Sequence, residues 1–282
     1  MSSIDLQPGA LAAAEALRWW IRNGVTEALD ETARNRFAES SRENGERPDA
    51  PNLSIREAPL TASENGLRAP QVAHAGSPPD AAETSARALA QSANDLETLR
   101  SVMAEFDGCA LKRTATRLVF ADGAPGSRVM FVGEAPGAEE DRLGRPFVGR
   151  AGQLLDRMLR AVGLDRQTVY VANVVPWRPP GNRTPTPQET QVCLPFIKRQ
   201  IDLADPEFLV CLGASAVRTV LGVETGIMRT RGSWFAYPRE DGREVRALAI
   251  LHPAFLLRQP AHKRFAWADM RALASALKIE SR

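Results

Sequence analysis

Long apolar runs are missing from this 282-residue sequence: no stretch approaches the roughly 18 consecutive apolar residues that a membrane-spanning helix needs. The start of the sequence lacks the basic segment and apolar core of a secretion signal. Only three cysteines are present, an odd number that does not fit a disulfide framework. We therefore expect a protein that makes no membrane contact and works in the reducing cytoplasm.

Charge of one sign does not dominate, because 36 Lys and Arg nearly balance 34 Asp and Glu. The balance changes along the chain: residues 1–80 hold 8 Arg and no Lys against 12 Asp and Glu, which leaves the remainder net basic. A basic folded part suits a polyanionic partner, and a solvated surface explains the same balance equally well.

Three regions follow from the distribution of apolar residues. Residues 1–38 contain an apolar stripe over 11–29, which predicts an amphipathic helix. Residues 39–80 are rich in Ser, Pro and charged residues without apolar periodicity, which predicts a flexible linker. Residues 81–282 form the predicted folded domain, and the 44% of hydrophobic residues in the whole sequence suffices for one sizeable core.

Short apolar strands alternate with helical patterns in this domain. The expected strands cover 129–132, 168–172, 208–212 and 248–251, and the expected helices cover 81–106, 149–162, 187–203 and 263–277. The alternation predicts a three-layer α/β/α sandwich with a central, mostly parallel four-stranded sheet. Ligands of such sheets bind at the loops that leave the carboxyl ends of the strands.

The first chemically rich loop follows the strand at 129–132. Residues 133–137 read GEAPG, in which the glycines permit close backbone approach to a ligand and Glu134 supplies a carboxylate. The Gly-Lys-Ser/Thr signature of a phosphate-binding loop does not follow it. Phe147 lies further on, among glycines at the start of a helix; its ring either packs in the core or offers a platform for a flat base.

Two other strand ends carry polar side chains. Asn173 has a carboxamide that either caps a turn or reads the mixed donor and acceptor edge of a pyrimidine. His252 precedes Pro253 and is either structural or an imidazole at the ligand-binding rim. An acid, a ring, a carboxamide and an imidazole at neighbouring strand ends can together hold a base flipped out of a nucleic acid.

Three segments resemble the motifs of the family 4 uracil-DNA glycosylases, in the same order and spacing: GEAPGAEEDRLGRPFVGRAGQLLDRML, YVANVVPWRPPGNRTPTPQE and HPAFLLR. The resemblance runs from about Phe106 to Trp267. It implies a three-layer fold and hydrolysis of the N-glycosidic bond of deoxyuridine in single- or double-stranded DNA. The products would be free uracil and an abasic site. Residues 81–282 would then be the catalytic domain of a base excision repair enzyme, which we expect to be a monomer.

The resemblance also implies roles for single residues of the base pocket. Phe147 resembles the residue that stacks on uracil, and Asn173 resembles the residue that reads its N3 and O4 edge. His252 is similar to the imidazole that donates a hydrogen bond to O2 as negative charge grows on the leaving base.

The acidic residues have implied roles as well. Glu134 resembles the acid linked to catalysis, either orienting water or offsetting positive charge on the sugar, with Glu140 and Asp141 as supporting acids. Gly133 and Ala135 would contact the substrate beside it. Ala135 stands where family 1 enzymes have a water-activating aspartate, so the group that activates water stays open.

Arginines flank the site loops, where they fit phosphate contacts or simply solvated surface charges. They are Arg145, Arg150, Arg178, Arg183 and Arg258. Leu256, Leu257 and Arg258 follow the histidine, and one of them is expected to fill the place of the flipped base. Leu256 and Arg258 are therefore included among the expected DNA contacts.

Most family 4 enzymes bind a 4Fe–4S cluster through four cysteines, and the resemblance places those positions at Phe106, Cys109, Trp177 and Cys193. Two thiolates do not suffice for a cubane cluster, so we expect no cluster and no metal. The two aromatic residues are expected to fill the vacated volume, with the remaining cysteines as small buried side chains.

Two alternative functions remain open. One is a glycosylase with a wider range of deaminated bases, such as hypoxanthine. The other is a non-catalytic protein that binds abasic or damaged DNA. A hydrolase of small nucleotides is disfavoured because the sequence has no phosphate-binding motif.

Overall fold

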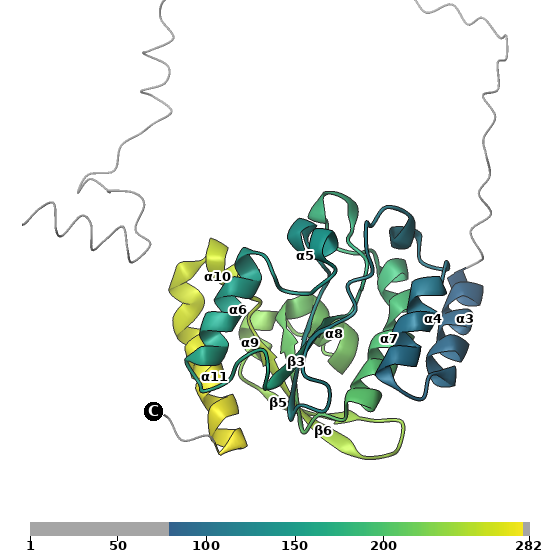
Figure 1. Cartoon of the computed structure of the whole chain (residues 1–282). Helices are drawn as coiled ribbons and strands as arrows, with labels where there is room; N and C mark the ends of the chain where they lie inside the picture. Colours follow the sequence, from purple (N-terminus) through teal and green to yellow (C-terminus); the bar gives the residue numbers. More distant parts are fainter. Residues whose placement is uncertain (1–78, 279–282) are drawn as a thin grey trace, which may run out of the picture. The chain divides into compact units, whose positions relative to one another are not determined.

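Figure 1 shows the computed structural model of the chain, which describes residues 79–278. The predicted helix over 11–29 lies outside these residues, and so does the predicted linker, except for its last two residues, which begin helix α3. Within residues 79–278, no helix is long and apolar enough to cross a lipid bilayer.

A six-stranded sheet with the order β1-β3-β2-β4-β6-β5 lies at the centre of the domain. Its four inner strands run parallel, and they are β2 (Val129–Gly133), β3 (Val169–Asn173), β4 (Phe208–Leu212) and β6 (Glu244–Ile250). The two edge strands, β1 (Asp122–Gly123) and β5 (Trp234–Pro238), are antiparallel to their neighbours. The α/β class and the parallel core are confirmed, but the predicted count of four strands is two too low.

The edge strand β5 was missed although its sequence, WFAYP, is apolar, because the run is short and ends in a proline, which weakens a strand pattern. It forms a hairpin with β6, which begins at Glu244 rather than at the predicted 248. The first part of β6 alternates between exposed and buried residues, whereas the prediction followed only its continuous apolar end. Gly242 closes the hairpin at a φ of 81°, a conformation that favours glycine.

Helices cover both faces of the sheet, with α3, α4 and α7 near one face and α6, α10 and α11 near the other (Figure 1). Their bounds are α3 (Pro79–Ser92), α4 (Leu96–Glu105), α5 (Ala138–Leu143), α6 (Arg150–Arg160), α7 (Pro187–Ala204), α8 (Gly213–Leu221), α9 (Ile227–Thr230), α10 (Pro253–Arg258) and α11 (Lys263–Leu277). The helical pattern predicted over 81–106 is two helices, because Asp95 accepts a hydrogen bond from the backbone N–H of Thr98 and caps α4.

Side chains of β2 alternate between two cores, which produces the three layers. Met130 and Val132 pack into a cluster that includes Phe196 of α7. Phe131 packs into a second cluster with Leu155 of α6 and with residues of α11. Because all five residues of β2 are buried, the strand is covered on both faces, as parallel sheets require.

Candidate functional site

The carboxyl ends of the inner strands open into a cleft of about 990 Å³. Glu134 follows β2, Asn173 ends β3 and His252 follows β6, and all three line this cleft together with Phe147. The structure therefore brings together the four residues that the sequence placed in loops after three different strands. Their shared position agrees with the rule for ligand sites of parallel sheets.

Gly133 allows the aromatic ring and the carboxamide to meet. A Cβ atom at this position would lie 2.5 Å from Cζ of Phe147 and 2.6 Å from Oδ1 of Asn173. Both distances are far below van der Waals contact, so any side chain here would displace one of the two groups. The ring of Phe147 also lies 5.6 Å from that of His252, at an interplanar angle of 31°.

The backbone of Phe147 is held in an unusual conformation. Its φ is 55°, in the left-handed region that a bulky residue seldom adopts. Nη2 of Arg166 donates a hydrogen bond of 2.5 Å to its carbonyl oxygen, while Nε of Arg166 donates to Asp156 at 2.6 Å. Gly152 packs so closely that a Cβ there would lie 1.6 Å from the same oxygen. These contacts with the backbone of Phe147 therefore fix the position of its ring.

Two buried acceptor atoms in the cleft have no donor. Asn173 is only 4% exposed, and its Oδ1 lacks a hydrogen-bond partner among the described residues. The same holds for Oε1 of Glu134. A buried acceptor without a partner costs about 1–3 kcal/mol, which a ligand with matching donors would recover. These atoms therefore favour a ligand with an N–H or O–H group at each position.

Glu134 sits in an environment that disfavours its charge. Burial raises the pKa of this carboxyl above its ordinary value, and the hydroxyls of Ser215 and Thr184 partly oppose that effect through hydrogen bonds. A carboxyl of this kind can change protonation state closer to neutral pH than an exposed glutamate does.

Glu140 and Asp141 accept hydrogen bonds from backbone N–H groups of the surrounding loops. Oε1 of Glu140 accepts hydrogen bonds from the N–H groups of Val148 (2.9 Å) and Gly149 (2.8 Å), and its Oε2 accepts one from Gly137 (3.1 Å). Oδ1 of Asp141 accepts two backbone N–H groups at 2.8 and 3.1 Å. Glu140 thereby ties the GEAPG loop to the segment that carries the aromatic ring, an arrangement suited to a supporting acid.

His252 caps helix α10 with one ring nitrogen, which leaves its second ring nitrogen for another partner. Nδ1 accepts a hydrogen bond of 3.1 Å from the backbone N–H of Ala254, so in the neutral ring the proton is on Nε2. Burial, and to a lesser extent the charge of Arg258, lower the pKa of His252 to about 4. The imidazole is therefore neutral at pH 7 and available as a hydrogen-bond donor through Nε2. Gly213, at a φ of 87°, leaves room for it because a Cβ there would lie 2.8 Å from Cβ of His252.

The predicted DNA-contacting arginines lie at different distances from the cleft. Arg183 and Arg258 line it, although Arg183 also forms a two-pronged ion pair with Glu189 at 2.7 and 2.8 Å. Arg145 and Arg150 are exposed at either side of the segment that carries Phe147. Arg178 is half-buried and donates to the Asn182 side chain at 2.7 Å.

The structure corrects the expectation for Leu256. Its side chain is 1% exposed and packs in a cluster with Leu251 and Ala266, because it lies on the inner face of α10. It cannot enter DNA without leaving this core. Leu257, which is half-buried, and Arg258, which is exposed, remain as candidates for the wedge.

Several residues of the cleft were missed from the sequence. Ser215, Thr184 and Arg218 line it, and the hydroxyls of the first two act to lower the pKa of Glu134 against the effect of burial. Ser215 follows the strand predicted at 208–212, so the strand-end rule would have found it had it been applied there. Thr184 gives no such signal because it lies eleven residues beyond the end of β3.

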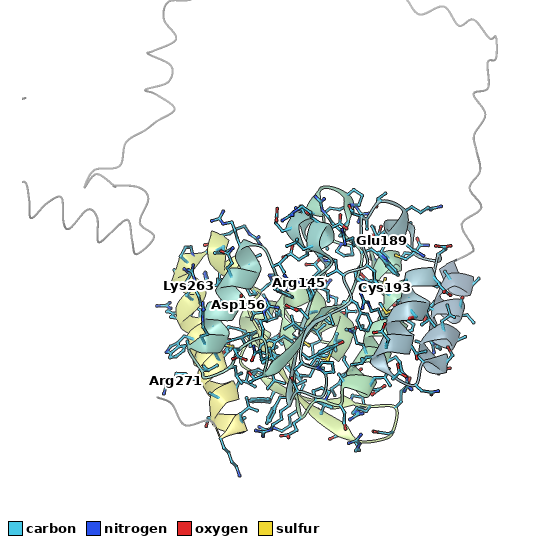
Figure 2. The ribbon with its side chains drawn as sticks, viewed as in Figure 1. Arg145, Asp156, Glu189, Cys193, Lys263 and Arg271 are labelled. Carbon is cyan, nitrogen blue, oxygen red and sulfur yellow. The ribbon has the colours of Figure 1, made fainter. Side chains whose placement is uncertain are left out.

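The four positions that the resemblance assigns to cluster cysteines do not fit an iron–sulfur cluster. Phe106 and Trp177 are buried side by side with ring centroids 6.4 Å apart, and Phe106 also contacts Phe196 at 5.0 Å. Cys109 and Cys193 are free thiols whose sulfur atoms lie 3.8 Å apart (Cys193 is labelled in Figure 2). Two carbon side chains thus occupy ligand positions, and the described residues contain no group of three or more metal-ligating side chains.

Comparison with known proteins shows which family the sequence resembles. The profile of the Uracil DNA glycosylase superfamily matches residues 120–271. The Type-4 uracil-DNA glycosylase of Thermotoga maritima is 40% identical over 178 residues, which cover 61% of this chain and 89% of that protein. The Type-4 enzyme of Archaeoglobus fulgidus is 40% identical over 172 residues, covering 58% and 86%. A Type-5 uracil-DNA glycosylase of Pyrobaculum aerophilum is 34% identical over 143 residues, covering 45% and 62%.

Proposed function

This chain belongs to the Uracil DNA glycosylase superfamily, and from that premise we propose that it hydrolyses the N-glycosidic bond of deoxyuridine in DNA. The products are free uracil and an abasic site, the substrate of later steps of base excision repair. One observation supports this most: a neutral histidine, an aromatic ring and a carboxamide with an unpaired acceptor surround one cleft at Gly133.

The base pocket follows from these groups. Uracil flipped out of the DNA stacks on Phe147, and its N3–H donates to the unpaired Oδ1 of Asn173, whose amide N–H donates to O4. Cytosine offers the reverse pattern at these two atoms, so the amide distinguishes the deaminated base. Nε2–H of His252 donates to O2 and stabilises the negative charge of the departing uracil.

The range of bases that the protein releases tests the proposal directly. Duplexes that carry uracil, hypoxanthine or thymine opposite guanine are incubated with excess protein, and the released base is quantified. We expect release of uracil, with hypoxanthine and thymine retained over the same time. Equal release of hypoxanthine would replace the proposal by a glycosylase of wider range. Tight binding of abasic DNA without release of any base would make the protein a non-catalytic binder.

The proposed role of Glu134 predicts the pH dependence of excision. Only the ionised carboxylate can orient a water or offset positive charge on the sugar, so the rate should fall as pH decreases through the raised pKa of Glu134. The midpoint should lie above 4.5, the ordinary value for glutamate. His252, whose pKa burial lowers to about 4, contributes to this limb only at its lowest pH.

Single-turnover rates measured across this pH range, with melting curves at each pH as a control for folding, test the assignment. Glu134→Gln should be slower and should lose the acid limb, because its amide does not titrate. An acid limb that persists unchanged in Glu134→Gln would assign the titration to another group.

We further propose that the active enzyme contains no 4Fe–4S cluster, because Phe106 and Trp177 fill two ligand positions. Protein purified without oxygen should contain far less than one iron per chain and lack the visible absorption of such a cluster. The double variant Phe106→Cys/Trp177→Cys restores four thiols and serves as the matched comparison after reconstitution with iron and sulfide. Near-stoichiometric iron in the wild-type protein, with the cluster absorption, would contradict the proposal.

The remaining expectations concern organisation and context. We propose that residues 81–282 act as the catalytic unit, that residues 1–38 and 39–80 are an appended helix and linker, and that the enzyme acts as a monomer in the cytoplasm. The composition of the N-terminal segments and the small number of cysteines support these proposals.

A further inference from the structure

Helices α6, α10 and α11 form a helix layer with an excess of positive charge. Three arginines lie on α6, one on α10, and three basic residues on α11, whereas the acidic residues of these helices are Asp156 and Asp269. The basic residues are Arg150, Arg157, Arg160, Arg258, Lys263, Arg264 and Arg271, and all are exposed. Figure 2 labels Lys263 and Arg271 on this layer.

Neither acidic residue neutralises this surface. Asp156 accepts a hydrogen bond from Arg166, and the buried Asp269 forms an ion pair with Arg231. None of the seven exposed cations has an ion-pair partner among the residues that the structure describes. Their positive charges are thus available to an external anion.

The opposite helix layer has a different charge pattern. Helices α3, α4 and α7 carry six Asp and Glu against four Lys and Arg. Arg87 pairs with Glu83 at 2.7 Å, and Arg100 pairs with Glu97 at 4.0 Å. The excess of unpaired positive charge therefore distinguishes the α6–α11 layer from the opposite helix layer.

This basic face begins at the proposed active site. Helix α6 starts three residues after Phe147, and α10 starts directly after His252. Along α6, Arg157 and Arg160 are three positions apart, and along α11 the exposed Trp267 and Arg271 are four apart, so each pair shares one side of its helix. Helix α11 has 15 residues and is about 22 Å long, a length over which duplex DNA presents about 13 phosphates.

We propose that the outer face of the α6–α11 layer binds the phosphate backbone of duplex DNA that flanks the flipped nucleotide. The inference rests on the proposed function in that it takes DNA as the partner of the adjacent cleft. Regular, unpaired cations that continue from that cleft fit an extended polyanion, and the 46% exposed Trp267 lies among them as an aromatic contact to the sugars or bases.

Binding of an undamaged duplex tests the proposal without involving catalysis. The triple variant Arg157→Gln/Arg160→Gln/Arg271→Gln removes three charges far along the helices. The control variant Arg87→Gln/Arg100→Gln/Lys198→Gln removes the same number from the opposite layer. We expect the first variant to bind roughly tenfold or more weakly and to lower the slope of log K against log salt by up to about 2.7, the value for three lost phosphate contacts. The control variant should match the wild type.

Excision from a short single-stranded uracil oligonucleotide, which ends at the cleft, should be unchanged in both variants. If the triple variant unfolds, Arg157→Gln and Arg271→Gln are measured singly, with a slope change of about 0.9 expected for each. Wild-type affinity and slope in the α6–α11 variant, or equal losses in both triple variants, would overturn the proposal. If the two triple variants differ in binding as predicted but the wild-type protein excises no uracil, the proposed DNA-binding face is retained and the proposed function is refuted instead.

Discussion

His252→Ala should slow the single-turnover excision of uracil by about 10²–10³-fold, the usual effect of removing one donor from a developing negative charge. The neutral ring donates through Nε2, because Nδ1 is already an acceptor for the N–H of Ala254. This donor is directed to charge that exists only as the base departs. The affinity for uracil-containing DNA should therefore change much less than the rate.

The matched control for this prediction is His262→Ala. His262 is also half-buried, but it lies outside the cleft and contacts the rings of Phe255 and Phe265. Its removal should leave the excision rate within a few-fold of the wild type. Rates are measured with enzyme in excess, and binding is measured separately with a non-cleavable uracil analogue in the DNA. A wild-type rate in His252→Ala would remove this residue from the mechanism.

Gly133→Ala should abolish most of the activity, although it adds a single methyl group. The new Cβ would overlap both Cζ of Phe147 and Oδ1 of Asn173, so stacking and edge recognition are disturbed at once. Base stacking contributes about 1–3 kcal/mol, and a hydrogen bond to a buried group contributes a similar amount. Together they predict a loss of roughly 30-fold to about 2 × 10⁴-fold in excision.

Overpacking also lowers stability, typically by about 1–3 kcal/mol, so melting curves must accompany the rates. Gly226→Ala is the matched control, because a Cβ at this position meets no atom within 4 Å and the φ of −56° suits any residue. The control should retain both stability and activity. If Gly133→Ala were folded and excised uracil at the wild-type rate, the contact between the ring and the carboxamide would not form part of the base pocket.

The sequence predicted the main site residues because they follow strands that are easy to recognise. Buried parallel strands are short apolar runs, and the residues that end them all reach one edge of the sheet. This reasoning located Glu134, Phe147, Asn173 and His252 together before their distances were known. It failed for Leu256 because the six residues of α10 are too few for a periodic pattern to show which side is buried.

Other features depend on contacts between distant segments and leave no local pattern. The hydrogen bond from Arg166 to the carbonyl oxygen of Phe147 joins residues 19 positions apart. The two hydrogen bonds that Glu140 accepts from the backbone N–H groups at 148–149 depend on the turn between them. The edge strand β1 has only two residues, too few for a strand pattern. These interactions position the ring, yet they become visible only when the chain is folded.

Release of free uracil by the purified chain is the most direct test of the proposed activity. Enzyme in excess is incubated with DNA that contains one deoxyuridine, and the free base and the abasic site are quantified by mass spectrometry. We predict equal amounts of uracil and abasic DNA, with the strand intact until alkali is added. Protein that is folded and binds the same DNA but releases no uracil would contradict the proposed glycosylase activity.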